Sequence, residues 1–233
     1  MIVSIHQPAY LPWLGYFHKI AASDTFVLLD TTQYEKNSFI NRNKIKTLDG
    51  GCFLTIPIST SGKFKNNALT DTQILGSNWK KKHWKSIQFN YKNAPYFSDY
   101  ESDIKQFYDA GWSHITDLSY KMLKYFLKQL KIDTDIVRAS NLDYPISYKT
   151  ELVLNICKSL GASYYISGAL GQNYLEISRF KKEGIKLLFQ EYKHPIYNQL
   201  FGDFEPYMSI LDLLFNEGPN SRDIILKDQI LRE

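Results

Sequence analysis

Short apolar runs alternate with amphipathic stretches along this chain of 233 residues. Five of the runs have the length and composition of buried β-strands, at 1–5, 25–29, 135–139, 163–167 and 185–190. Apolar residues at helical spacing predict helices at 14–22, 150–160, 175–182 and 208–215. Because strands that alternate with helices form βαβ units, we predict an α/β fold with a Rossmann-like, mostly parallel sheet.

Residues 78–130 interrupt this alternation, because their pattern is helical from end to end. No linker or internal repeat divides the chain, so we expect a single α/β domain over residues 1–233, with a helical insertion at about 78–130. Residues 52–58 predict one more strand, and the polar loop at 59–67 is the best candidate for a mobile flap.

Composition excludes some classes of protein and leaves others open. Hydrophobic residues make up 44% of the chain, which suits a globular core. The net charge of +4 is too small to indicate a nucleic-acid partner, and it is compatible with an anionic small-molecule substrate. No apolar run is long enough to cross a bilayer and no leader pattern precedes the first strand, so we expect a cytoplasmic protein without membrane insertion. The sequence leaves a homodimer open.

Metal and covalent chemistry find no support in the sequence. The two cysteines, Cys52 and Cys157, form no CxxC pair and are expected to be small buried side chains. HExxH and paired-histidine spacings are absent, so we expect no metal. No G-x-S-x-G motif marks a nucleophilic serine.

The strongest candidate residues follow the first two predicted strands, because parallel sheets bind ligands at the carboxyl ends of their strands. His6 is a candidate general base or acid, with a turn histidine as the alternative. Asp30 is a candidate to bind hydroxyls or orient a base, or else it caps a turn. The residues after His6 combine hydrogen-bonding groups with aromatic rings that suit a pocket wall: Gln7, Tyr10, Trp13, Gly15 and Tyr16.

Basic and amide side chains form two candidate phosphate-binding groups. Arginine offers a planar fork and lysine a point charge. The first group is Asn41, Arg42, Asn43 and Lys44. The second is a basic helix with Lys82 and His83, for which a solvated helix face is the alternative. His83 is also a second candidate for the base.

Two later loops complete the candidate set. The glycine-bearing loop after residues 163–167 lets backbone N–H groups approach a ligand, or is a plain tight turn, and it matches neither GxGxxG nor the Walker A pattern. The segment after the last predicted strand collects further polar side chains, and Asp212 lies on an apolar helix where a buried acid needs a partner. The substrate-binding candidates here are Ser167, Gly168, Gly171, Tyr174, His194, Tyr197 and Gln199.

Several blocks of sequence carry a resemblance to a known family. At the start they are His6-Gln7-Pro8-x-Tyr10-Leu11-Pro12-Trp13-Leu14-Gly15-Tyr16-Phe17-x-Lys19-Ile20, Ser23-Asp24 and Asp30. Later blocks are Asn41-Arg42-Asn43-Lys44-Ile45, Trp79-x-x-Lys82-His83, Ala94-Pro95-Tyr96-Phe97, Ser167-Gly168 with Gly171 and Tyr174-Leu175, Pro195-x-Tyr197-x-Gln199, and Ser209-x-x-Asp212-Leu213-Leu214-Phe215-Asn216. Together they resemble the WbqC-like protein family from residue 1 to about residue 218.

A second resemblance concerns the fold. The first strand, the proline-containing turn and the helix that follows resemble the opening βαβ unit of adenylyl- and cytidylyltransferase-like proteins, which carry H-x-G-H at this turn. Here Trp13-Leu14-Gly15-Tyr16 stands in its place, with Tyr16 where the second histidine would be. This departure argues against nucleotidyl transfer and leaves nucleotide binding open.

The resemblance to the WbqC-like family implies a bacterial protein of O-antigen or other surface-polysaccharide synthesis. It implies transfer of an acyl or aminoacyl group, such as glycyl, to the amino group of a nucleotide-linked deoxyamino sugar. The partners would be that sugar and an acyl donor, which is acyl-CoA, another thioester, or an acyl group activated by ATP. We expect His6 or His83 to act as the base, aided by Asp30, with Arg42, Lys44 and Lys82 on the diphosphate. An ATP-dependent amide ligase and a non-catalytic sugar-nucleotide or glycan-binding module are the alternatives.

Overall fold

A parallel sheet forms the centre of the protein in the computed structural model, which describes residues 1–59, 68–227 and 231–232. Its strands are β1 (Ile2–His6), β2 (Thr25–Leu28), β5 (Asp135–Arg138), β6 (Tyr164–Ser167) and β7 (Lys186–Gln190), with the short antiparallel β8 (Leu231–Arg232) at one edge. All five apolar runs therefore form strands, and the α/β prediction is confirmed. The loop expected to be a flap lies outside the described residues, apart from Ser59.

The strand order β5-β2-β1-β6-β7-β8 makes the sheet doubly wound. From β1 the chain adds β2 and β5 on one side and then returns to add β6 and β7 on the other. This is the Rossmann arrangement, and its topological switch point lies between β1 and β6. Ligands of doubly wound sheets bind in the crevice outside the carboxyl ends of the strands at that point.

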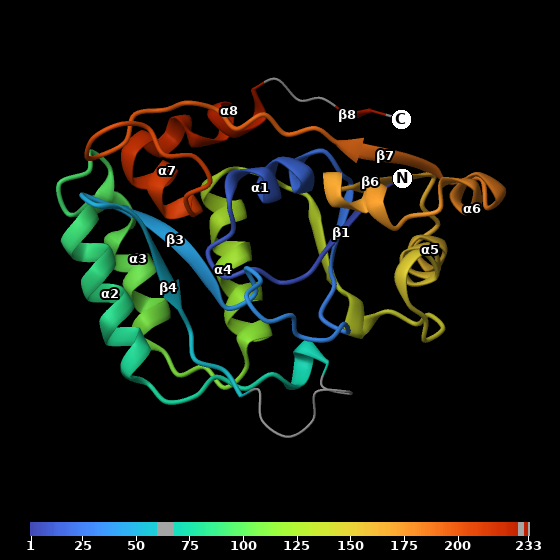
Figure 1. Cartoon of the computed structure of the whole chain (residues 1–233), viewed down its shortest axis with the longest axis horizontal. Helices are drawn as coiled ribbons and strands as arrows, with labels where there is room; N and C mark the ends of the chain where they lie inside the picture. Colours follow the sequence, from blue (N-terminus) through green and yellow to red (C-terminus); the bar gives the residue numbers. More distant parts are fainter. Residues whose placement is uncertain (60–67, 228–230, 233) are drawn as a thin grey trace.

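Helices cover both faces of the sheet. They are α1 (Leu14–Ala21), α2 (Asn78–Tyr91), α3 (Phe97–Asp109), α4 (Ile115–Gln129), α5 (Lys149–Ser159), α6 (Ile177–Lys182), α7 (Ile210–Glu217) and α8 (Ser221–Leu226). Short 3-10 turns occupy Leu69–Asp71, Ala139–Asn141, Ala169–Asn173 and Gly218–Asn220. Figure 1 shows α5 and α6 at one end of the molecule and α2, α3 and α7 at the other, with α1 and α4 between them.

Two hydrophobic cores lie on the opposite faces of the sheet. Side chains alternate along a strand, so Phe26 and Leu28 join the core under α1 and α4, whereas Val27 joins the core under α5 and α6. The first core is the larger, and it continues into α2, α3 and α7. The predicted helical stretch at 78–130 therefore forms α2, α3 and α4, which precede β5 in the chain and pack against the same core as α1.

The strand predicted at 52–58 needs correction. It is β4 (Gly50–Thr55), and it pairs antiparallel with β3 (Arg42–Thr47) in a hairpin separate from the parallel sheet. The sequence predicted no element at β3, whose polar residues form a strand because half of its side chains face the core and half face outward. Cys52 on β4 is exposed rather than buried, whereas Cys157 is buried as expected.

The part of the chain that the structure describes contains no helix long and apolar enough to cross a membrane.

Candidate functional site

The carboxyl end of β1 lies at the switch point of the sheet. β1 pairs with β2 as far as His6 and Leu28, but its register with β6 ends at Ser4 and Ile166. The two central strands therefore stop pairing before β1 reaches His6. His6, which ends β1, lies where the fold predicts a ligand.

His6 is half-buried and its ring is held by its neighbours. Its Nδ1 lies 3.1 Å from the Gln7 carbonyl oxygen, so Nδ1 carries the proton and donates it there. Edge-to-face contacts with Tyr16, at 4.8 Å between ring centroids, and with Trp13, at 5.5 Å, fix the ring plane. Among the described residues nothing hydrogen-bonds to Nε2 of His6. The free nitrogen is therefore an acceptor lone pair available to a ligand.

Electrostatics keep the His6 ring neutral. Burial, and next the positive charge of Lys19, lower the pKa of His6 from 6.5 to about 3, and the hydrogen bond to Gln7 only partly opposes this. At neutral pH His6 is thus an uncharged imidazole. It can accept a proton from a group that becomes strongly acidic during a reaction.

Lys19 is an unusual neighbour for a histidine, since only 2% of it is exposed. Its Nζ donates to the Ile5 carbonyl oxygen at 2.9 Å, next to the point where β1 and β6 stop pairing. Within residues 1–59, 68–227 and 231–232 Lys19 makes no ion pair, and burial lowers the pKa of its ammonium from 10.5 to about 7. An ammonium has three donors, and Lys19 uses one. No described residue pairs with its remaining donors or with its charge.

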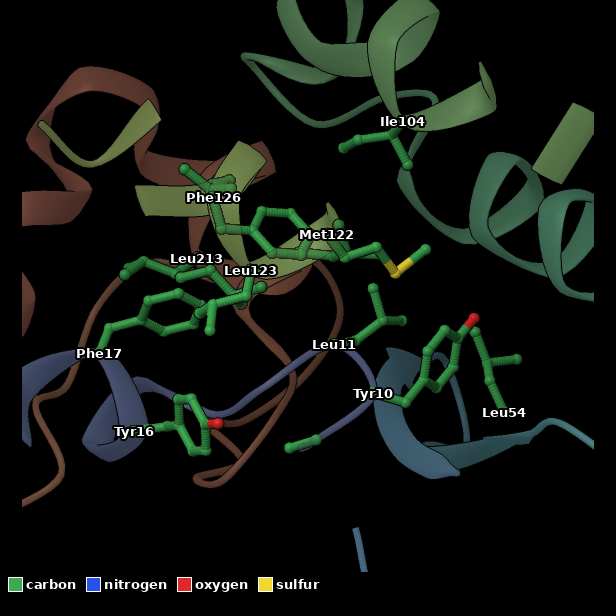
Figure 2. Close-up of a cluster of buried hydrophobic side chains, with 14 of the residues drawn as sticks. Tyr10, Leu11, Tyr16, Phe17, Leu54, Ile104, Met122, Leu123, Phe126 and Leu213 are labelled. Carbon is green, nitrogen blue, oxygen red and sulfur yellow. The ribbon is translucent and has the colours of Figure 1, made fainter. Parts of the chain in front are cut away.

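The aromatic residues of the opening motif divide into two groups. Trp13 and Tyr16 contact His6, and the Tyr16 hydroxyl donates to the Gln7 carbonyl oxygen at 3.0 Å. Tyr10 is instead fully buried beside Leu54, and Figure 2 shows its side chain among the hydrophobic side chains of the first core. Of these rings, only the half-buried Trp13 is accessible enough to be a pocket wall.

Gly15 permits a close approach, as its position in the motif suggested. A Cβ at Gly15 would lie 2.8 Å from Cδ1 of Tyr192, which follows β7. The Gly15 carbonyl oxygen accepts a hydrogen bond from Gln190 Nε2 at 2.9 Å, and the same amide group reaches His18. Gly15 therefore lets α1 pack against the end of β7.

Asp30 is completely buried and its carboxylate is fully engaged. Oδ2 accepts from Arg138 Nε at 2.7 Å and from Ser140 Oγ at 2.9 Å, and Oδ1 accepts from the Ser140 backbone N–H at 2.9 Å. Arg138 also donates to Asp117. This geometry fits a positioning residue that anchors the loop after β5, one of the roles that its place in the sequence left open.

The predicted glycine-bearing loop follows β6 at the same edge of the sheet as His6. Ser167 is buried and donates to the Gly168 carbonyl oxygen at 3.1 Å. A Cβ at Gly171 would lie 2.0 Å from Ser167 Oγ, so the loop can close over Ser167 only with glycine. Tyr174 is about half exposed beyond this loop.

His83 lies in the interior with both ring nitrogens occupied. Nε2 donates to the Thr55 carbonyl oxygen at 3.2 Å, and Nδ1 accepts from the Tyr10 hydroxyl at 3.0 Å, which in turn accepts from Tyr108 at 2.8 Å. Burial lowers the pKa of His83 to about 4. The chain of hydrogen bonds ties α2 and α3 to the first loop and leaves no ring nitrogen for a substrate.

The predicted phosphate-binding residues are engaged with the protein or lie on the surface. Asn43 is buried and donates to the Leu11 carbonyl oxygen at 2.6 Å, while Asn41 bonds Ile56 and Tyr34. Arg42 stacks on Phe53 and donates to the Asn37 carbonyl oxygen. Lys44 lies 3.6 Å from Glu205, and Lys82 is exposed on α2. No contact joins these cations to His6 in the described part of the chain.

The candidates after β7 form a second polar cluster, which we call the Asp212 cluster: Lys46, Tyr91, Tyr197, Gln199 and Asp212. Asp212 accepts from the hydroxyls of Tyr91 and Tyr197 at 2.8 and 2.7 Å and from Gln199 Nε2 at 2.7 Å. Lys46 donates to Gln199 Oε1 at 3.0 Å and to the Asp203 carbonyl oxygen. Burial raises the pKa of Asp212 despite these donors. Each of the five side chains of the cluster is hydrogen-bonded to another polar group of the protein.

His194 is likewise held by local bonds. Its Nδ1 donates to the Pro195 carbonyl oxygen at 2.8 Å, and its Nε2 accepts from the Tyr207 backbone N–H at 3.1 Å. The pKa of His194 is lowered by burial. Both ring nitrogens of His194 are therefore occupied by protein atoms.

Lys19 is the functional candidate that sequence reasoning missed. Its position on α1 is the signal. This short helix connects two buried strands, and all of its residues from Leu14 to Ile20 are buried, so Lys19 has no solvent-facing side of the helix to occupy. A charged residue at a core-facing helix position is a functional signal.

No group of three or more histidine, cysteine, aspartate or glutamate side chains in the described chain could hold a metal ion.

Comparison with known proteins identifies the family. The model of the WbqC-like protein family matches residues 7–224. The chain is 35% identical over 226 residues to the uncharacterized protein Rv1507c of Mycobacterium tuberculosis, and the match covers 96% of both chains. No solved structure matches the chain significantly. With a family match over almost its full length and a relative at this identity, the chain belongs to the WbqC-like protein family.

Proposed function

We propose that the protein is a cytoplasmic enzyme of bacterial surface-polysaccharide synthesis, such as that of O-antigen. It transfers an acyl or aminoacyl group to the amino group of a nucleotide-linked deoxyamino sugar. The observation that carries the proposal is the neutral His6 ring at the switch point of the sheet, with Nδ1 bonded to Gln7 and Nε2 free of partners in the described chain. A free acceptor nitrogen at the ligand-binding edge of a doubly wound sheet suits a general base.

The chemical step needs a base of this kind. The sugar amine attacks the acyl carbonyl carbon of a thioester, the new C–N bond forms, and the C–S bond breaks. The attacking nitrogen becomes positively charged as it bonds and must lose a proton to a nearby base. His6 accepts that proton at Nε2 and the departing thiolate receives it, which balances the reaction.

Lys19 supports the same proposal through its charge. A buried ammonium without a carboxylate partner is unfavourable unless a ligand supplies the negative charge. The diphosphate of a nucleotide-linked sugar is such a ligand. An anion near Lys19 would also offset the positive charge that lowers the pKa of His6, and so would make the base stronger when substrate is bound.

A panel of donors and acceptors tests the proposal. Purified protein is incubated with dTDP- and UDP-linked amino sugars and with acyl thioesters, and in parallel with glycine and ATP, and products are followed by mass. We expect a sugar nucleotide whose mass has grown by the acyl group, formed from a thioester without ATP. Product that requires ATP would identify an amide ligase instead. Binding of the sugar nucleotide without product in any mixture would identify a non-catalytic binding module.

A further inference from the structure

A cavity of about 600 Å³ opens at the carboxyl ends of β2 and β5, beside the His6 site. The loops after both strands line it, together with the segment that leads into α5. Its size is that of small-molecule sites in proteins. None of the candidate residues from the sequence lies in its wall, so it is a separate feature of the same edge of the sheet.

The wall of the cavity is uncharged among the residues that the structure describes. Thr31, Thr32 and Ser140 bring hydroxyl groups, and Tyr144 and Tyr148 bring aromatic rings. A phosphate or carboxylate group would find no cation among the described residues of this wall. The wall hydroxyls already bond to protein groups, but their oxygens keep a lone pair that a ligand donor can use. A planar, uncharged ring with polar edges can stack on the aromatic rings and hydrogen-bond to the hydroxyls of this wall.

Protein contacts hold this wall in place before any ligand binds. Asp30 fixes Ser140 through the backbone N–H and the hydroxyl, both at 2.9 Å, and Thr31 Oγ1 lies 2.8 Å from the Tyr144 hydroxyl. Arg138 neutralises the buried charge of Asp30 beneath the loop. Tyr148 is different, because 80% of it is exposed and its ring is therefore accessible to a ligand.

The cavity adjoins the His6 site through one hydrogen bond. Gln7, the residue after His6, donates from Nε2 to Thr32 Oγ1 at 3.0 Å. We infer that the cavity binds the nucleoside of the sugar nucleotide, with the base against Tyr148 and Tyr144 and the diphosphate leaving past Gln7 toward β1. This inference rests on the proposed function for the identity of the whole substrate, but the nucleoside alone suffices to test it.

Calorimetric titration of the nucleosides themselves gives the test, with no acyl donor present. Thymidine, uridine, adenosine and guanosine are titrated into wild-type protein, with methyl glycosides as neutral sugars without a base. We expect at least one nucleoside to bind and the methyl glycosides not to. Tyr148→Ala should weaken nucleoside binding about tenfold, because stacking of one base on an aromatic ring contributes roughly 1–3 kcal/mol.

Two further variants keep the result interpretable. Thr31→Val removes one exposed hydroxyl, leaves the fold intact, and should weaken binding about threefold. Phe89→Ala is the matched control, since Phe89 is another aromatic residue that is 76% exposed but lies on α2, and it should bind nucleosides like the wild type.

The outcomes separate this inference from the proposed function. The inference is overturned if no nucleoside binds, if methyl glycosides bind instead, or if Tyr148→Ala and Thr31→Val both bind like Phe89→Ala. Nucleoside binding that depends on Tyr148, in a protein that forms no acylated product, supports the cavity and contradicts acyl transfer. Acylated product with no effect of the cavity variants contradicts the cavity alone.

Discussion

Two buried polar clusters in this protein are built on opposite principles. In the Asp212 cluster three donors converge on one carboxylate, and Lys46 meets two acceptors. At the carboxyl end of β1, Lys19 has one acceptor for three donors, and His6 has a nitrogen that nothing in the described chain satisfies. The first cluster is complete without a ligand and the second is not.

Buried polar groups that are satisfied by the protein have a different effect on stability from those that are not. A satisfied buried network stabilises the native state and makes its geometry unique. An unsatisfied buried charge destabilises it, and a fold retains such a group where function needs it. The residues after β7 were weaker candidates in the sequence than His6, and their hydrogen bonds show that Tyr197 and Gln199 are bonded to other polar groups of the protein.

Removal of the Asp212 carboxylate should have the largest effect on stability. Asp212→Ala would leave the hydroxyls of Tyr91 and Tyr197 and the Gln199 amide without their acceptor, at a cost of about 3–5 kcal/mol. Urea unfolding measures this free energy. Asp212→Asn, which keeps the volume and one oxygen, should lose less. A loss below about 1 kcal/mol for Asp212→Ala would mean that the cluster is not structural.

Lys19→Met should stabilise the protein, in contrast to Asp212→Ala. The pKa of Lys19 is about 7 when folded and 10.5 when unfolded, so the unfolded chain holds the proton more tightly between these values. The destabilisation is fully present below pH 7 and fades as the pH rises toward 10.5. We expect Lys19→Met to increase the free energy of unfolding by roughly 2 kcal/mol at pH 6, with the gain gone near pH 10.

Lys46→Met is the matched control for this prediction. Lys46 is also a buried lysine, 3% exposed, but its ammonium is bonded to Gln199 and Asp203. Its replacement should destabilise the protein at pH 6. If both substitutions lowered the stability equally, the contrast between the two clusters would be lost.

His83→Gln should change the acid stability of the protein. The pKa of His83 is about 4 in the folded protein, below its ordinary 6.5, so between these values only the unfolded chain takes up the proton. Stability is therefore lost as the pH falls from 6.5 to 4, by up to about 1.4 kcal/mol per pH unit from this residue. Unfolding series at pH 4.5 to 8 should show a shallower slope for His83→Gln. Equal slopes would contradict the buried neutral ring.

Gly15→Ala should give the smallest effect, a loss of about 1 kcal/mol by thermal unfolding, because its Cβ meets the ring of Tyr192 at 2.8 Å. Gly51→Ala in β4 is the comparison. Its Cβ would meet Glu205 Oε1, the far end of a flexible side chain that can move away. A larger loss at Gly51 than at Gly15 would contradict the close packing of α1 on the end of β7.

Local pattern was sufficient to predict the strands of the sheet. The five apolar runs form the parallel strands because buried parallel strands are continuous apolar runs, and His6 ends β1. The strand order was not predicted, because the neighbouring strands β2 and β5 are separated by residues 29–134 in the chain. The pairing of β3 with β4 could not be predicted. Arg42-Asn43-Lys44 has polar side chains on both faces of a strand, so apolar and polar residues do not alternate there.

The hydrogen-bond partners of the buried polar residues could not be predicted from the sequence either. The sequence does not reveal that His83 bonds to Tyr10 and Thr55, because these partners are distant in the chain. The same holds for Asp30 and its partners Arg138 and Ser140. Such long-range pairing decides whether a polar residue is available to a ligand. The free Nε2 of His6 became visible only with the structure.

The proposed reaction takes place at His6 and not in the Asp212 cluster. The most direct measurement is the initial rate of N-acylated sugar nucleotide formation by wild type, His6→Asn and Tyr197→Phe, each with its fold checked by circular dichroism. We predict that His6→Asn lowers the rate by at least about 100-fold, while Tyr197→Phe stays within about threefold of the wild type. A His6→Asn rate equal to that of the wild type, or a larger loss of rate in Tyr197→Phe than in His6→Asn, would contradict the proposal that His6 is the base.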